Sequence, residues 1–139
     1  MQGRAPDIPA GRDGAEQAND VLAIAEHVKK LIDSGTALPD IRALYWHPDC
    51  VSFDLKGDVH EGLEAIEAAN ARVPDGMEVI ARSFSEPLVG PRSFAIFCKT
   101  TLRDVEKGRV TDLTKMGVFE VRDGLVVREE YLDAAGRFH

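Results

Sequence analysis

The sequence predicts an α+β fold, in which helices pack on one face of a curved antiparallel sheet. Three observations support this prediction. Apolar residues recur at helical spacing in the first half of the chain, and strand-like runs fill the second half. The turn sequence Asp123-Gly124 joins the last two of these runs as a hairpin.

Three helices are predicted before residue 76. The first ends at Ser34-Gly35, where glycine can adopt the left-handed cap. The second begins at Pro39-Asp40 and ends before Pro48, and the third runs from near Glu61 to the Pro-Asp-Gly turn at 74–76. Their apolar faces carry, in order, Val21, Ile24, Ala25, Val28, Leu31 and Ile32; Ile41, Leu44 and Tyr45; and Leu63, Ile66 and Val73.

Strands account for most of the remaining chain. A short one is predicted over residues 50–55, between the second and third helices. Four more follow the third helix, over residues 77–89, 92–105, 109–121 and 125–133, with turns at 106–108 and 123–124. Helices followed by an antiparallel meander are typical of an α+β domain.

Composition restricts the class of protein. The 139 residues suffice for one domain, which we expect over 16–139, after an arm over 1–15 that is rich in Gly, Pro, Ala and charge. A net charge of −7 with no basic stripe argues against a nucleic-acid or membrane surface. Cys50 and Cys98 are expected to be free buried thiols, and the N-terminus lacks the apolar core of a secretory signal, so we expect a cytoplasmic protein.

Local catalytic motifs are absent from the sequence. It contains no GxGxxG, Walker, GxSxG or HExxH pattern, and His27, His47, His60 and His139 lack metal-ligand spacing. We therefore expect no metal and no cofactor. Acid–base chemistry by scattered carboxylates, or binding without catalysis, remains open.

Several short patterns, in their order, resemble the nuclear transport factor 2-like superfamily, which includes SnoaL-like polyketide cyclases, ketosteroid isomerases and limonene epoxide hydrolases. The matching segments span the chain after the arm: LIDSG, IRALYWHPDCVSFD, HEGLEAIEA and GVFEVRDGLVVREEYLD. The resemblance implies a cone-shaped sheet around an apolar pocket closed by the helices. It also implies a homodimer through the outer sheet face and a small apolar molecule as ligand.

Asp54 is the first catalytic candidate. It matches the general-base position of ketosteroid isomerases, where a carboxylate of raised pKa would shuttle a proton. The competing interpretation is a strand-end Asp that faces water before the Gly57 turn. The isomerase oxyanion-hole Asp would fall at Gly117, and without that group enolisation loses its largest electrostatic contribution.

Glu130 is the second candidate, because it matches a carboxylate of the epoxide hydrolase site. The Arg and the other Asp of that site fall at Cys98 and Thr100, so the same water activation is not expected. A pair of Asp54 and Glu130 would replace it, with one pKa raised by the like charge. The resemblance implies that Glu130 points inward and that Glu129 and Tyr131 point outward. The competing interpretation is that Glu130 is a salt-bridged residue on the surface.

Lys115 is the third candidate. Leu113, Lys115, Gly117 and Phe119 share one strand face, which lines the pocket in the family. A lysine there requires a partner, and Glu130 on the adjacent strand is the expected one. A register slip of one residue would instead leave Lys115 solvated.

We expect the substrate to contact Tyr45, Cys98, Thr100, Leu113 and Phe119. Two functions remain open. The first is an acid–base isomerase, cyclase, dehydratase or epoxide hydrolase acting on an apolar cyclic or polyketide-like molecule. The second is a non-catalytic ligand-binding or dimeric interaction module, since this superfold hosts both.

Overall fold

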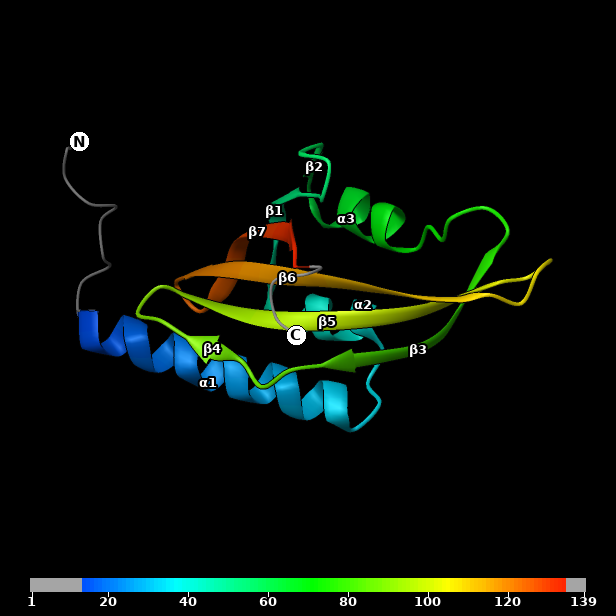
Figure 1. Ribbon diagram of the computed structural model, residues 1–139. Coiled ribbons are helices and arrows are strands. Elements are labelled where there is room, and N and C mark those ends of the chain that lie inside the picture. Colours follow the sequence, from blue (N-terminus) through cyan, green and yellow to red (C-terminus); the bar gives the residue numbers. More distant parts are fainter. Residues whose placement is uncertain (1–13, 135–139) are drawn as a thin grey trace.

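The computed structural model describes residues 14–134. Three helices lie on a curved seven-stranded sheet (Figure 1), which confirms the predicted α+β fold. The elements, in chain order, are α1 (Gly14–Asp33), α2 (Leu38–Tyr45), β1 (Trp46–Phe53), β2 (Val59–Glu61), α3 (Leu63–Asn70), β3 (Met77–Phe84), β4 (Leu88–Val89), β5 (Ser93–Asp104), β6 (Val110–Arg122) and β7 (Leu125–Asp133).

The helices form where the apolar periodicity predicts them. In α1, Val21 and Ala25 are fully buried against the sheet, and Gly35 ends the helix with the predicted positive φ of 83°. The shorter α3 ends at Asn70, and Val73, which the periodicity assigned to its apolar face, is 42% exposed beyond it.

The strand β1 begins at Trp46, four residues before its predicted start, and therefore includes Pro48. This proline lies where the register of β1 against β7 shifts, between Trp46 and Val51. Proline is tolerated at such an irregularity because no regular ladder hydrogen bond depends on its missing N–H. The early start places Trp46 on the sheet rather than on the helix.

The sheet has the order β2-β1-β7-β6-β5-β3, with β4 paired to β5. The strands after α3 form the predicted antiparallel meander, whereas β1 and β7 run parallel, so the sheet is mixed. The predicted strand over 77–89 is divided into β3 and β4 by the segment 85–87. The last strand of the meander thus returns beside the first strand of the chain.

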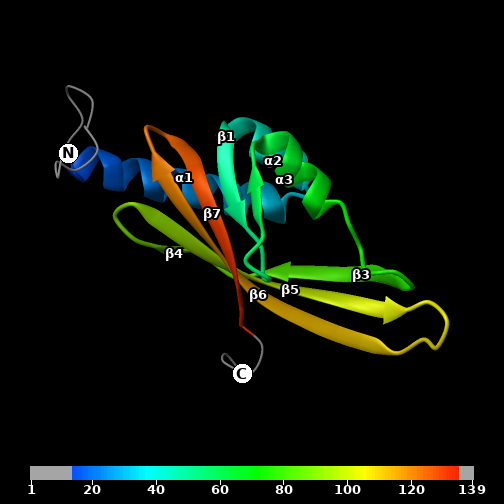
Figure 2. The ribbon, with the colours of Figure 1, turned by 90° about the horizontal axis from the view of Figure 1, so that it is seen from above.

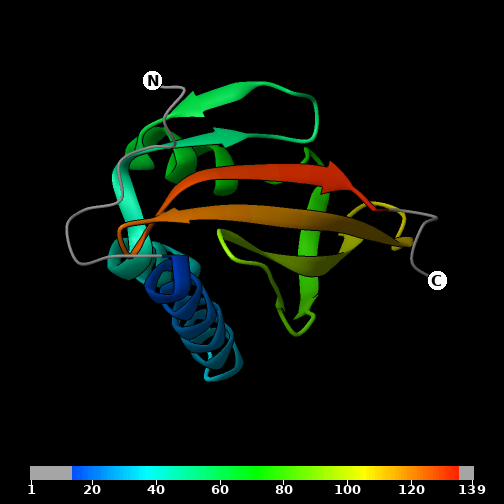
Figure 3. The ribbon, with the colours of Figure 1, turned by 90° about the vertical axis from the view of Figure 1, so that its left-hand side faces the viewer.

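Curvature gives the sheet a concave inner face. The long β5–β6 hairpin extends beyond the helices (Figure 2), and β3 is turned strongly relative to β7 (Figure 3). The helices α1 and α2 lie on the concave side, and α3 packs near β1 and β2. The buried core, which includes Ile41, Ile66, Phe94 and Val126, lies between the helices and this concave face.

Residues 1–13 of the predicted arm lie outside the described residues, and Gly14 and Ala15 are the first two residues of α1. Within residues 14–134, no helix is both long and apolar enough to cross a membrane.

Candidate functional site

A cavity of about 530 Å³ opens between the concave face of the sheet and the helices. Ligand sites usually have volumes of about 300–1,000 Å³ and mostly apolar walls with a few polar groups. Here the walls come from all three helices and from β1, β3, β5, β6 and β7. The polar and aromatic lining residues are Arg42, Trp46, Glu67, Asn70, Arg82, Phe84, Cys98, Thr100, Lys115, Phe119 and Tyr131.

Glu129 is a completely buried carboxylate behind this cavity, with 0% of its surface exposed. The indole Nε1–H of Trp46 donates to its Oε1 at 2.6 Å, and the hydroxyl of Ser52 donates to its Oε2 at 2.8 Å. A buried charge requires such donors, since an uncompensated one is very costly. Glu129 therefore joins β7 to both ends of β1.

A β-bulge turns Glu129 inward. Glu120 pairs with Arg128 and Val121 pairs with Val126, which leaves Val127 as an extra residue on β7. One extra residue reverses the face of the sheet to which each following side chain points. Val126 and Glu129 are consequently both buried, although plain alternation would place them on opposite faces.

The predicted inward orientation of Glu130 is therefore wrong. Glu130 lies outside the cavity lining, its side chain is 40% exposed, and it pairs with Arg128 at 3.4 Å. Glu129 and Tyr131, which were expected on the outer face, point inward instead. Alternation alone did not choose between the two faces, and the inward position of Glu130 came from the family resemblance, which does not include the bulge at Val127.

Tyr131 lies on the cavity wall beside Glu129. Burial raises the pKa of Tyr131 well above its usual value, and the nearby charge of Glu129 and a hydrogen bond to it act in the same direction. Gly117 makes room for the ring, because a Cβ there would lie 3.1 Å from Tyr131 Cε1 and 2.6 Å from Phe119 Cζ. The phenol is thus held neutral beside a buried carboxylate.

Lys115 faces the cavity, which agrees with the predicted face of β6. Its expected partner Glu130 is not there, and Lys115 forms no ion pair within the described part of the chain. Its Nζ lies 4.5 Å from the centre of the Tyr131 ring, a cation–π distance. Burial lowers the pKa of Lys115, and the charges of Arg82 and Arg42 lower it further, against the opposing effects of Cys98 and Glu129.

Two arginines add positive charge to the wall. Arg42 on α2 is 8% exposed and forms two hydrogen bonds to the carboxylate of Glu67 on α3, at 2.7 and 2.5 Å. Arg82 on β3 lines the cavity and makes no ion pair among residues 14–134. The charge of Arg42 is balanced by the protein, whereas that of Arg82 is available to a ligand.

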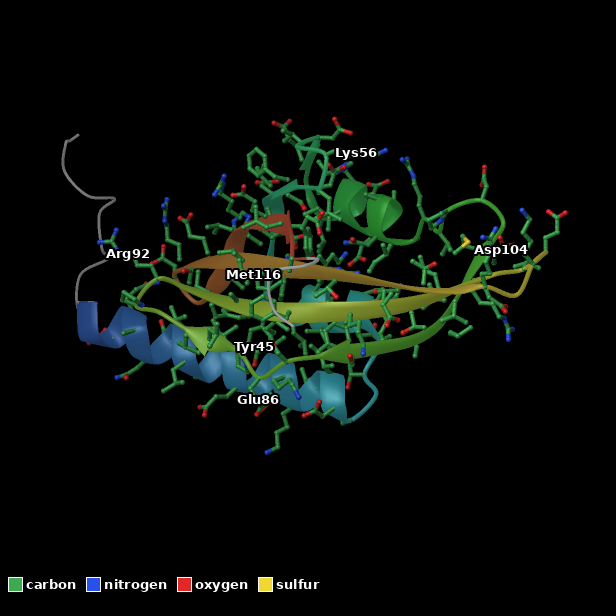
Figure 4. All side chains as sticks on the ribbon, viewed as in Figure 1. Tyr45, Lys56, Glu86, Arg92, Asp104 and Met116 are labelled. Atoms are coloured by element: carbon green, nitrogen blue, oxygen red, sulfur yellow. The ribbon has the colours of Figure 1, made fainter. Side chains whose placement is uncertain are left out.

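Asp54 lies apart from the cavity. Its carboxylate accepts backbone N–H groups of Lys56 and Asp58 and lies 3.0 Å from Nε2 of His60. Figure 4 shows Lys56 in the outer turn near β2, on the side of the sheet away from α1. The structure thus does not bring Asp54 together with Glu130 or Lys115, and the hydrogen bond from His60 keeps the pKa of Asp54 low rather than raised.

Only some of the predicted substrate contacts line the cavity. Cys98, Thr100 and Phe119 line the cavity, whereas Leu113 is 48% exposed and outside the lining. Tyr45 is also outside the lining, and its hydroxyl is hydrogen-bonded to Nδ1 of His27 on α1. The β6 face therefore reaches the cavity only from Lys115 onward, and the strand extends beyond the cavity at Leu113.

Sequence patterns did not indicate Glu129, Arg42 or Arg82 as site residues. Glu129 and Trp46 meet across 83 positions, and Arg42 and Glu67 across 25. An indication for Tyr131 was available, because Val127 and Tyr131 look as apolar as the opposite face of that strand.

Comparison with solved structures identifies the architecture. A proposed SnoaL-like polyketide cyclase from Mesorhizobium loti superposes with a TM-score of 0.68 at 22% identity, covering 80% of this chain and 97% of that chain. The fold is that of the nuclear transport factor 2-like superfamily. This result confirms the predicted resemblance at the level of the fold.

Other nuclear transport factor 2-like folds agree. A proposed SnoaL-like polyketide cyclase from Jannaschia sp. CCS1 has a TM-score of 0.64 at 19% identity, covering 88% of this chain and 90% of that chain. TerC, crystallised with polyporic acid, has a TM-score of 0.56 at 18% identity, covering 84% and 90%. No family model and no curated protein matches the sequence.

Proposed function

We propose that the cavity binds an oxygenated cyclic or polyketide-like small molecule and that the protein is an acid–base enzyme acting on it. One observation carries the proposal: the completely buried carboxylate of Glu129 lies beside a phenol, Tyr131, that lines the cavity. A phenol of perturbed pKa at a cavity wall, beside a buried carboxylate, is typical of acid–base sites.

The rest of the wall suits a flat, mostly apolar ligand. The rings of Trp46 and Phe119 lie 5.5 Å apart at 67°, and those of Phe119 and Tyr131 lie 6.2 Å apart at 84°. Apolar side chains such as Ile96 and Val28 extend this surface. The polyketide cyclase-like neighbours and the polyporic acid bound to TerC support a ring-containing ligand.

The proposed chemistry is a proton relay. The Tyr131 oxygen takes a proton from an acidic position of the substrate while its own proton passes to Glu129. Arg82, which forms no ion pair with a carboxylate among residues 14–134, stabilises the negative oxygen that develops on the substrate. Tyr131 is the catalytic group in this scheme, and Glu129 positions it and accepts its proton.

A turnover screen tests the proposal. Wild type is compared with Tyr131→Phe, Glu129→Gln and Glu130→Gln on cyclic ketones, epoxides and polyketide-like β-ketones. We expect Tyr131→Phe and Glu129→Gln to lose most of kcat, with a changed pH profile, and Glu130→Gln to retain it. Asp54→Asn is included as a second control, and we expect it to retain full activity because Asp54 lies outside the cavity lining.

A second candidate function is ligand binding without catalysis. It is favoured by the hydrogen bonds that Glu129 already receives from Trp46 and Ser52, because a saturated carboxylate can be purely structural. Saturable binding with no turnover in the screen would support this alternative.

We also propose that the chain forms a homodimer through the outer sheet face. On that face Met116 pairs with Leu132 across β6 and β7, and Val118 is the next residue along β6 on that face. Leu132 is 41% exposed. We expect Val118→Glu to convert a dimer into a monomer in light scattering, and a monomeric wild type would contradict this proposal.

A further inference from the structure

Lys115 differs from the other lysines of the chain in its surroundings. It projects from the middle of β6 into the cavity, directly across from Cys98 on β5. Its Nζ lies over the Tyr131 ring, 4.5 Å from the ring centre. No carboxylate forms an ion pair with it within the described chain, and Cys98 and Glu129 favour its ammonium form only through their charge.

Lys29 provides the contrast. Its side chain is only 14% exposed, but its Nζ lies 2.7 Å from Asp33 and 3.1 Å from Glu86. These carboxylates raise the pKa of Lys29, whereas burial lowers that of Lys115 and Arg82 and Arg42 act with it. An amine in an apolar pocket, next to other cations, is the environment that activates a lysine as a nucleophile.

We propose that Lys115 is an amine nucleophile that condenses with the carbonyl group of a ketone or aldehyde bound in the cavity. The inference rests on the proposed small-molecule site and names the class of its substrate. It also adds a covalent step that the proton relay of Tyr131 does not require. Other cavity cations, Arg42 and Arg82, cannot replace Lys115, because a guanidinium is always charged.

The step balances without an oxidant or a cofactor. The neutral Nζ attacks the carbonyl carbon and forms a carbinolamine. The carbonyl oxygen then leaves as water with the two amine hydrogens, and a C=N bond remains. This neutral imine takes a proton from solvent and becomes an iminium ion, which withdraws electrons and acidifies a neighbouring C–H. The Tyr131 ring lies against Nζ, and its phenol is the group that we expect to take the proton from that carbon.

Acetylacetone is a suitable probe for this chemistry. A lysine amine and this 1,3-diketone form a conjugated enaminone with loss of one water, and the product absorbs in the near ultraviolet without any reductant. The folded wild-type protein is incubated with acetylacetone and followed by absorbance and intact mass. Peptide mapping then assigns the adduct among the six lysines.

We expect one adduct per chain, with the mass of the probe minus one water, located at Lys115. Lys115→Met and Lys115→Arg are expected to lose it completely, while circular dichroism verifies that they fold. Lys99→Met is the matched control, because Lys99 is exposed on the neighbouring strand β5 and points to the other face of the sheet. It is expected to label like wild type.

Two results would overturn the inference: no adduct on wild type, or equal labelling of Lys115 and the surface lysines. Quenching of Trp46 fluorescence by 1-tetralone, a cyclic ketone, distinguishes the two proposals, because Trp46 is the single tryptophan and lines the cavity. If 1-tetralone quenches wild type while no adduct forms, the nucleophile is refuted and the binding site stands. If 1-tetralone does not quench the fluorescence and acetylacetone forms no adduct, both proposals fail.

Discussion

Replacement of Glu129 by leucine is expected to destabilise the protein strongly, although the new side chain is apolar and the site is buried. The substitution removes the acceptor for Trp46 Nε1–H and for the Ser52 hydroxyl. A buried donor left without a partner costs about 1–3 kcal/mol, so two of them cost about 2–6 kcal/mol. Relief of the desolvation of the carboxylate offsets part of this, and we expect a net loss of about 2–4 kcal/mol.

Glu130→Leu is the matched control for this prediction. Glu130 is the next residue on the same strand, and it makes one exposed pair with Arg128, a kind of interaction that contributes about 0–1 kcal/mol. Both variants are unfolded in urea at neutral pH and followed by circular dichroism. If Glu130→Leu loses as much stability as Glu129→Leu, or more, the inward orientation of Glu129 is refuted.

Three further predictions follow from the titratable groups. Burial lowers the pKa of Lys115, so its charge opposes folding below that pKa, and this penalty disappears as the pH rises toward the unfolded pKa of about 10.4. We therefore expect Lys115→Met to be more stable than wild type at neutral pH. A stability advantage of the mutant that grows with pH would contradict this prediction. The hydrogen bond from His60 lowers the pKa of Asp54, so its stabilising effect is present above about pH 3.9 and is lost as the pH falls through the lowered pKa. The stability gap between wild type and Asp54→Asn should therefore close in acid, and a constant gap in urea unfolding would count against it. Burial raises the pKa of Cys50 to about 12, whereas Cys98 lines the cavity, so we expect iodoacetamide to alkylate Cys98 faster than Cys50. Equal alkylation rates of the two cysteines, measured by peptide mapping, would disprove this.

Local sequence patterns predicted most of the fold. Gly35 ends α1 in the left-handed conformation, and the Asp123-Gly124 turn joins β6 to β7, as their residue types indicate. The parallel pairing of β1 with β7 was not predicted, because it depends on a contact between the two ends of the domain. Local chemistry determines turns and caps, but it contains no information on which distant strand becomes a neighbour.

The site was predicted less well, for two physical reasons. The bulge at Val127 has no clear sequence signature, and it exchanged the positions of Glu129 and Glu130 relative to the cavity. The pairing of Arg42 with Glu67 is a contact between two helices that single-helix patterns do not report. The orientation of Lys115 was predictable, because β6 is regular around it.

The central claim is that the cavity is a binding site for a cyclic, carbonyl-bearing molecule. The most direct test is a fluorescence titration of Trp46 with 1-tetralone on three proteins: wild type, Cys98→Phe, which fills the cavity, and Lys99→Phe, whose new ring points away from it. We predict saturable quenching in wild type and Lys99→Phe and its loss in Cys98→Phe. Absence of saturable quenching in wild type, or equal quenching in Cys98→Phe, would contradict the claim.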